Sequence, residues 1–311
     1  MSRYFLLAAL AMNLAAEDRK LSSPSTPFDF YFSADGKTIA ARCRDNHVRS
    51  WDLASGKLVA DKTRSAQATM LAANLLIEGD PKSKTMKVWD LTADRQLQLL
   101  NGAPARTATV SKDRKFIATS NPGERSIRIW DLATGKQNHK LTDGLGGASE
   151  LVFSPDGETV VSANYDNDIR VWKTRSGELV RKVEDMTGAM FAADFTPDGK
   201  QLIMAGLDET VYIWDAKTFS LVRKLKGHGE TISSLSISPD GRTLVTGGFD
   251  VITQRNPVKL AIWDLAAGKI TKSISVPHRV FSIAFSPDGK WIAFNTGENE
   301  ISLLNLEAAA R

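Results

Sequence analysis

The residue types of a nucleophilic triad occur within one stretch of the chain, as His228, Thr246 and Asp250. In such a triad the imidazole acts as the general base, the carboxylate orients it, and the hydroxyl attacks the substrate. Two observations argue against this chemistry. Threonine is an uncommon nucleophile away from a chain terminus, and the same aspartate position recurs without a histidine, as at Asp166. We therefore predict a structural role for these residues and no catalytic site.

Metal, redox and phosphate chemistry find little support in the remaining residues. The four histidines are His47, His139, His228 and His278. None of them forms a pair at ligand spacing. Cys43 is the only cysteine, which excludes an internal disulfide, a CxxC redox motif and a cysteine-based zinc site. The glycine-rich run at 144–147 lacks the strand-to-helix context of a phosphate-binding loop. We expect no metal and no cofactor.

The composition indicates an ordinary globular protein. Apolar residues make up 42% of the chain and charged residues 24%, which is enough apolar material for a sizeable core. Lys and Arg number 40 against 36 Asp and Glu, and the basic residues are scattered rather than clustered. The net charge of +4 therefore reflects a small imbalance, and we expect no nucleic-acid partner.

The N-terminal segment differs from everything after it. One positive charge at Arg3 precedes an apolar run, Tyr4–Ala16, which ends in small residues and is followed by charged ones. This pattern is typical of a secretory signal peptide, and the run is too short to span a bilayer as a permanent helix. We interpret residues 1–16 as a signal peptide and expect a periplasmic or extracellular protein with no integral membrane segment after processing. The alternative is a cytoplasmic protein with an N-terminal tail.

The chain repeats two short phrases in phase. The first is Trp-Asp at the end of a β-rich run, with Leu304-Asn305 as a weaker last copy. Its tryptophans are Trp51, Trp89, Trp130, Trp172 (followed by Lys173), Trp214 and Trp263. The second phrase is a turn of the Ser-Pro-Asp-Gly type, which follows Phe32, Phe153, Phe195, Ile237 and Phe285 in exact or variant form. A period of about 40 residues, with one hairpin turn and one Trp-Asp per unit, predicts the blades of a propeller.

The segments between these turns read as short strands. In the third segment of each repeat, apolar and polar residues alternate until the tryptophan, where both faces become apolar. Strands with both faces covered suit sheets that are stacked side by side around a ring. The turn is degraded in the third repeat, at 111–114, and lost in the second, around Ala72 and Ala73. These two blades should deviate most from the pattern.

With these two phrases the chain resembles the WD-repeat (WD40) β-propeller family over residues 17–311. The resemblance implies an all-β fold, a single seven-bladed propeller of four-stranded antiparallel blades. It also implies that His228, Thr246, Asp250 and Trp263 form a buried hydrogen-bonded set in the sixth repeat.

The other repeats keep only parts of this set. Ala41 and Met204 stand at the hydroxyl position in the first and fifth repeats, and most repeats lack the histidine. Asp45 has neither a histidine nor a hydroxyl partner of this kind. We therefore expect Asp45→Ala to destabilise the protein less than Asp250→Ala, which would leave polar groups of the set unsatisfied.

One rim of the predicted ring carries candidates for partner binding. The residues just before the loop aspartate are equivalent between repeats, and they are Arg44, Tyr165, Leu207 and Phe249. Apolar side chains at such positions are typical anchors for a partner, although packing against neighbouring loops would explain them equally well. A seven-residue insertion at 251–257 adds Arg255 and Asn256 as polar candidates.

These observations favour a non-catalytic, monomeric scaffold that binds a protein or peptide through this rim. The alternative is an exported propeller enzyme or cofactor-binding protein with its site in the central channel. That alternative requires charged side chains to converge from the first strand of several repeats. Those strands contribute mainly small and apolar residues, with Asp194 as the exception.

Closure of the ring should involve the N-terminal region. The last repeat supplies three strands, around 280–285, 291–295 and 301–306, and leaves no room for a fourth. An open blade would expose a strand edge that invites aggregation. The tripeptide at 19–21, Arg-Lys-Leu, echoes Arg-Lys-Leu at 223–225, which ends an outer strand. We predict that about Glu17 to Leu21 pairs with Ile301 to Leu306.

Overall fold

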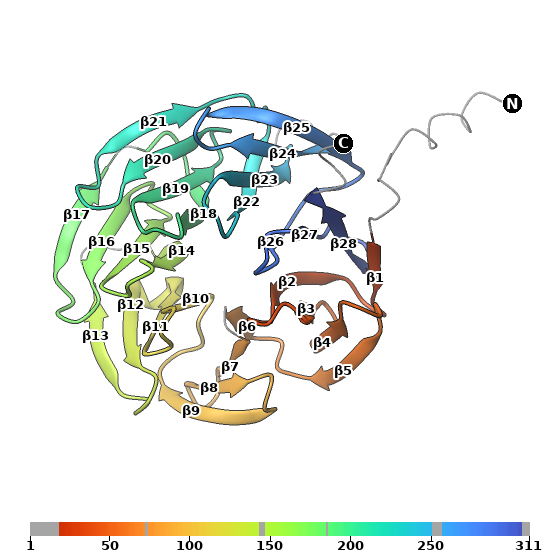
Figure 1. Ribbon diagram of the computed structural model, residues 1–311. Helices are drawn as coiled ribbons and strands as arrows, with labels where there is room; N and C mark the ends of the chain where they lie inside the picture. Colours follow the sequence, from red (N-terminus) through yellow and green to blue (C-terminus); the bar gives the residue numbers. More distant parts are fainter. Residues whose placement is uncertain (1–18, 72–73, 143–146, 185, 251–256, 307–311) are drawn as a thin grey trace, which may run out of the picture.

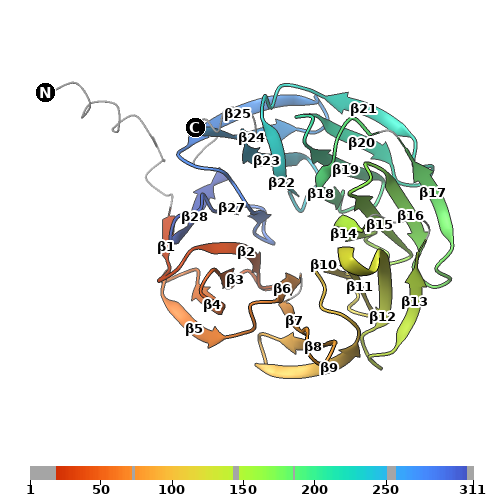
Figure 2. The ribbon, with the colours of Figure 1, turned by 180° about the vertical axis from the view of Figure 1, so that it is seen from behind.

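Each repeat forms one four-stranded antiparallel sheet, and seven such blades are arranged around a central channel (Figures 1 and 2). This computed structural model describes residues 19–71, 74–142, 147–184, 186–250 and 257–306. The first strand of each blade lies nearest the channel and the fourth lies at the circumference. The prediction of a seven-bladed, four-stranded antiparallel propeller is confirmed.

From the channel outward, the strands of blades 1 to 4 follow the order of the chain. Blade 1 comprises β2 (Pro27–Phe32), β3 (Thr38–Cys43), β4 (His47–Asp52) and β5 (Leu58–Thr63). Blade 2 comprises β6 (Ala68–Leu71), β7 (Leu75–Asp80), β8 (Thr85–Asp90) and β9 (Arg95–Asn101). Blade 3 comprises β10 (Thr107–Val110), β11 (Phe116–Asn121), β12 (Ser126–Asp131) and β13 (Gln137–Leu141), with a 3-10 turn η1 (Pro122–Glu124). Blade 4 comprises β14 (Ala148–Phe153), β15 (Thr159–Asn164), β16 (Ile169–Lys173) and β17 (Leu179–Val183).

The remaining blades follow the same order, except that the N-terminal strand completes blade 7. Blade 5 comprises β18 (Met190–Phe195), β19 (Gln201–Gly206), β20 (Val211–Asp215) and β21 (Leu221–Leu225). Blade 6 comprises β22 (Thr231–Ile237), β23 (Thr243–Phe249), β24 (Val258–Asp264) and β25 (Lys269–Val276). Blade 7 comprises β26 (Ile283–Phe285), β27 (Trp291–Phe294), β28 (Glu300–Asn305) and β1 (Arg19–Ser22).

The hairpin between the first two strands is built by the recurring turn phrase. In blade 4, Ser154 Oγ donates to Asp156 Oδ1 at 2.5 Å and accepts from the Thr159 amide at 3.0 Å. Gly157 has φ 72°, the left-handed conformation in which glycine has no steric penalty. In the degraded turn of blade 3, Arg114 takes this conformation at φ 58°. The turn therefore survives there because the Ser-x-Asp hydrogen bonds are kept, with Ser111 Oγ to Asp113 Oδ1 at 2.7 Å.

The core lies between neighbouring blades rather than within one. Trp263 of blade 6 belongs to a buried cluster with Ile203 and Ile213 of blade 5. Trp130 of blade 3 packs in the same way with Leu75 of blade 2. Because each blade is apolar on both faces, it can bury them only between two neighbours, and the ring lets every blade do so.

The N-terminal strand closes the ring, as predicted. Strand β1 pairs antiparallel with β28, with Lys20 opposite Ser302 and Leu21 opposite Ile301. Leu21 thereby takes the place that Leu225 has opposite Val211 in blade 5. The echo between the two Arg-Lys-Leu tripeptides therefore reflects equivalent positions in the outer strands. The predicted strand began at Glu17, and residues 17 and 18 lie outside the described part of the chain.

Candidate functional site

The residues that resemble a triad are packed inside blade 6. Trp263 Nε1 donates to Thr246 Oγ1 at 2.8 Å, and both His228 and Thr246 are fully buried. His228 Nδ1 lies 3.1 Å from the carbonyl oxygen of Glu230. Burial lowers the pKa of His228 to about 4, so the imidazole is neutral at physiological pH. A substrate cannot reach a hydroxyl that is enclosed by the core and already accepts a hydrogen bond from an indole. The predicted contact of Asp250 with this set stays a prediction.

The other blades show what each tryptophan does when its hydroxyl partner changes. Trp130 Nε1 donates to Thr119 Oγ1 at 2.9 Å in blade 3. In blade 1, where Ala41 replaces the hydroxyl, Trp51 Nε1 donates to the carbonyl of Ser22 at 3.0 Å instead. In blade 5, where Met204 replaces it, the indole nitrogen of Trp214 has no partner among the described residues. In blade 1 the strand that closes the ring thus supplies a replacement acceptor for the indole nitrogen. In blade 5 the described residues supply none.

The loop acids in three blades are held by an arginine that the sequence reasoning missed. In blade 1, Arg49 donates to both carboxylate oxygens of Asp45, at 2.9 and 2.7 Å, and its side chain is only 3% exposed. Arg170 with Asp166 and Arg128 with Glu124 repeat this contact in blades 4 and 3. Hydrogen bonding from Arg49 holds the pKa of Asp45 below its usual range.

The expectation that Asp45→Ala destabilises the protein less than Asp250→Ala stays a prediction, but Asp45 is not without a side-chain partner. Its partner is a guanidinium rather than a histidine or hydroxyl. A basic residue four positions after the loop acid was the available signal in the sequence.

The predicted rim residues occupy equivalent places on one face. We call it the top face, defined by the loops between second and third strands and by the connections entering each blade. The amides of Arg44, Tyr165 and Leu207 donate to the carbonyls of Thr26, Gly147 and Ala189, which directly precede the first strand of the same blade. The Tyr165 and Leu207 side chains are 44% and 43% exposed, and Arg44 is also exposed.

Phe249 takes the same position in blade 6 but is half-buried. The guanidinium of Arg279 lies 5.6 Å from its ring centre and 5.4 Å from that of Phe281, which is 37% exposed. Arg279 and Phe281 precede the first strand of blade 7, outside either recurring phrase, and sequence reasoning did not select them. Arg255 and Asn256 lie outside the described residues.

A groove of about 540 Å³ lies on the same face, over blades 1 to 3. Its lining includes Pro81 and Gly123, from loops between second and third strands, and Arg106, from the connection into blade 3. Gln67 and Asn121 add polar side chains to this lining. The top face is therefore polar and hollowed over the first blades and apolar at the exposed loop positions of the later ones.

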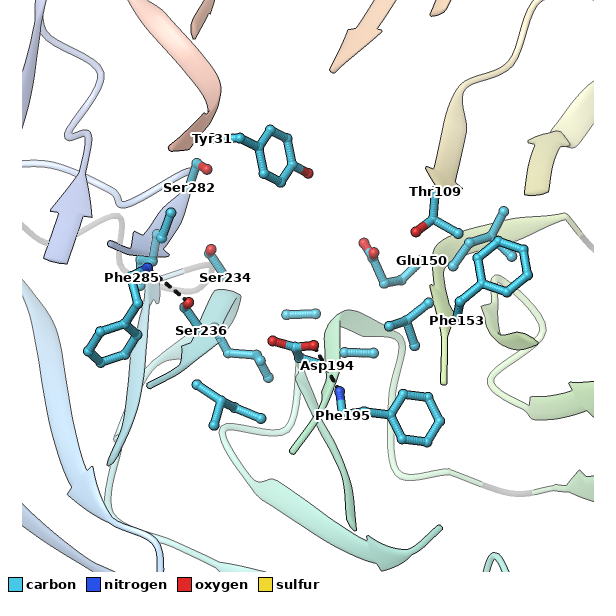
Figure 3. Close-up of a pocket in the computed structure, with 18 of the residues that line it drawn as sticks. Tyr31, Thr109, Glu150, Phe153, Asp194, Phe195, Ser234, Ser236, Ser282 and Phe285 are labelled. Carbon is cyan, nitrogen blue, oxygen red and sulfur yellow. Dashed lines mark hydrogen bonds between the residues drawn. The ribbon is translucent and has the colours of Figure 1, made fainter. Parts of the chain in front are cut away.

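The central channel holds a cavity of about 730 Å³, shown in Figure 3. Glu150 from β14 and Asp194 from β18 carry their carboxyl groups into it, and the ring of Tyr31 from β2 enters from another side. Thr109, Ser234 and Ser282 add hydroxyls.

Glu150 and Asp194 are each half-buried: their side chains reach the channel, and the ring of blades surrounds them. Desolvation raises the pKa of Glu150 to about 8, with a smaller contribution from the charges of Asp29 and Asp194. Desolvation also raises the pKa of Asp194 to about 7. Among the residues that the structure describes, no group of three or more His, Cys, Asp or Glu is placed to hold a metal ion.

Of these three residues, only Asp194 was predicted from the sequence as a polar side chain of a first strand, whereas Glu150 and Tyr31 were not. These positions belong to first strands, where alternate residues face the channel. The alternation along each first strand can be read from the sequence. The sequence does not show that side chains from three different blades converge on the channel.

Four segments of the chain match the family described as WD domain, G-beta repeat: residues 135–173, 177–215, 219–250 and 268–299. Each matched segment begins with the outer strand of one blade and continues into the inner strands of the next blade of the seven-bladed ring. The chain carries WD40 repeats and folds as a seven-bladed β-propeller. WD-repeat propellers generally serve as scaffolds for protein interactions.

Two curated proteins resemble parts of this WD-repeat propeller. An uncharacterized WD repeat-containing protein of Synechocystis sp. is 31% identical over 140 residues, which cover 41% of this chain and 38% of that protein. Protein tipD of Dictyostelium discoideum is 36% identical over 76 residues, which cover 24% of this chain and 12% of that protein. The matched regions thus span well under half of either relative. Within the described residues, the propeller has no helix with the length and apolar character needed to cross a membrane.

Proposed function

We propose that this propeller binds a protein or peptide segment across its top face, with Tyr165, Leu207 and Phe249 as apolar anchors. The observation that carries the proposal is the exposure of Tyr165 and Leu207, 44% and 43%, at loop positions that are equivalent between blades. Exposed apolar side chains gathered on one face are characteristic of interaction sites. The groove over blades 1 to 3 offers the same partner a polar, concave surface.

The circumference is the competing surface, because it also exposes apolar side chains. Leu58, Val59, Leu99, Val180, Leu221 and Val222 all belong to outer strands. These strands carry Lys and Arg between their apolar residues, for example Arg223 and Lys224 in β21. Charged residues on edge strands oppose strand-to-strand association, so the top face is the better candidate.

The test combines a rim variant with a control of matched exposure. Affinity capture from the native host, followed by mass spectrometry, first identifies the partner of the wild-type protein. Its affinity is then measured for the variant Tyr165→Ser, Leu207→Ser, Phe249→Ser and for the control Leu58→Ser, Leu99→Ser, Leu221→Ser on the circumference.

We expect the rim variant to lose binding, because truncated hot-spot residues each cost about 2 kcal/mol or more. It should unfold at nearly the same temperature, because Tyr165 and Leu207 are exposed and the half-buried Phe249 belongs to none of the core clusters that the described residues form. The circumference variant should bind normally. Unchanged binding by the rim variant, or loss of binding in the control alone, would refute the top-face assignment.

Export as a monomer is the second part of the proposal. It is supported by the signal-like pattern at residues 1–16, which lie outside the described residues. Cleavage after Ala16 would preserve Arg19–Ser22, the strand that closes the ring. Cell fractionation, the intact mass of the mature protein and sedimentation of the purified protein test this together. A cytoplasmic protein retaining Met1, or a stable dimer, would contradict it.

A further inference from the structure

The channel cavity contains acidic groups without cationic partners. Glu150 forms no ion pair among the described residues, and its carboxylate is approached by the amide of Leu151. Asp194 likewise has no ion pair there, and its Oδ1 accepts only the amide of Phe195, at 2.8 Å. By contrast, Asp29, just outside the cavity lining, is paired with Arg42 at 3.1 Å. The acids that face the cavity are therefore the ones left without a cation.

The rest of the lining is neutral, with one exception. Four of the described lining residues are titratable: Tyr31, Lys112, Glu150 and Asp194. Lys112 is exposed and belongs to the hairpin turn of blade 3, at one mouth of the channel. Around the acids the lining consists of serine and threonine hydroxyls, small and aliphatic residues such as Ala193 and Val152, and Phe191. Such a lining combines an apolar wall with a few directed polar groups, as binding sites for small molecules do.

From this cavity and its unpaired acids we infer that the central channel binds a slender organic cation, a primary ammonium group on an aliphatic chain, between Glu150 and Asp194. The two acids come from adjacent blades and open into one space (Figure 3). An ammonium group offers three N–H donors, enough to reach both carboxylates and a hydroxyl. The cavity volume of about 730 Å³ lies within the range of small-molecule sites. This site is separate from the top-face anchors, and the inference does not depend on them.

The occupant is expected to be an organic cation rather than a metal ion. The described residues supply no group of three metal-ligating side chains, and a hard divalent cation requires about six oxygen ligands. The aliphatic part of an amine can instead lie against the apolar lining. For a diamine, the second ammonium group can meet water at the channel mouth.

Binding should be coupled to proton release. Glu150 and Asp194 have pKa values of about 8 and about 7, so both are largely protonated at pH 6. A cation favours their ionised forms and must displace these protons. The other titratable groups facing them are Tyr31, which burial keeps neutral in this range, and Asp29, which is already paired. Affinity should therefore rise between pH 6 and pH 9.

The test is calorimetric titration of the full chain with 1,5-diaminopentane, with 1,5-pentanediol as a neutral ligand of similar shape. We expect saturable one-to-one binding of the diamine and none of the diol. The double variant Glu150→Gln, Asp194→Asn should bind at least tenfold more weakly at pH 8.5. The control Glu158→Gln, whose side chain is 59% exposed outside the channel, should bind within twofold of wild type.

Two further readouts keep the inference falsifiable. Circular dichroism must show that the double variant is folded, and single variants replace it otherwise. The heat of wild-type binding, measured in buffers of different ionisation enthalpy, should reveal proton release near pH 7. Equal affinity of wild type and a folded channel variant, equal binding of diol and diamine, or no binding of the diamine would each overturn the inference.

Discussion

Replacing Leu21 by alanine tests how the ring is fastened. Leu21 is 1% exposed and belongs to a buried cluster with Trp51, Ile301 and Leu303. Truncating a leucine in such an environment costs about 2–5 kcal/mol, through lost burial and the cavity left behind. We expect a loss of about 3 kcal/mol in the free energy of unfolding, because Leu21 connects the first and last blades. Urea denaturation followed by tryptophan fluorescence measures it.

Two leucines of blade 5 provide matched controls for this measurement. Leu225 occupies the equivalent outer-strand position and is 6% exposed, so Leu225→Ala should cost a similar amount. Leu221 is 41% exposed on the same strand, and Leu221→Ala should change stability by less than about 0.5 kcal/mol. If Leu21→Ala were as mild as Leu221→Ala, β1 would not contribute to closure in solution.

Removal of the whole strand should have a larger effect than Leu21→Ala. A chain beginning at Pro24 would leave Trp51 Nε1 without the Ser22 carbonyl, which it reaches at 3.0 Å. It would also expose the edge of β28, and an exposed strand edge promotes aggregation. A chain beginning at Glu17 keeps β1 and serves as the reference. Equal denaturation midpoints and equal solubility of the two chains would refute the closure mechanism.

The buried polar groups lead to three other predictions. Trp263→Phe should destabilise by about 1–2 kcal/mol more than Trp214→Phe, because only Trp263 has a hydroxyl partner, Thr246, to leave unsatisfied; equal denaturation midpoints would contradict this. Asp45→Ala should cost about 1–3 kcal/mol by leaving Arg49 short of a partner, which a neutral result in the same assay would refute. Because folding raises the pKa values of Glu150 and Asp194, the folded state holds their protons more tightly, and stability should fall as pH rises from about 5 to about 8. The Glu150→Gln, Asp194→Asn variant should flatten that slope, and an unchanged slope in thermal melts across this range would refute the assignment.

The amino-acid sequence by itself determined the architecture. A phrase that recurs about every 40 residues must form a repeated unit, and apolar residues on both faces of its third strand require a neighbour on each side. Even closure of the ring was encoded locally, since Arg-Lys-Leu at 19–21 repeats the outer-strand pattern at 223–225. Likewise, the sequence places Met204 where some other blades have the hydroxyl partner of the tryptophan, and Trp214 Nε1 has no partner among the described residues. These features depend on backbone periodicity and on short-range patterns.

Only the tertiary structure decided which side chains meet. Glu150, Asp194 and Tyr31 are far apart in the sequence and belong to different repeats, and each alone resembles an ordinary polar residue on a strand. They converge because the ring turns the first strand of every blade toward one channel. Their raised pKa values also arise there, because desolvation depends on the surrounding blades and not on neighbouring residues in the chain.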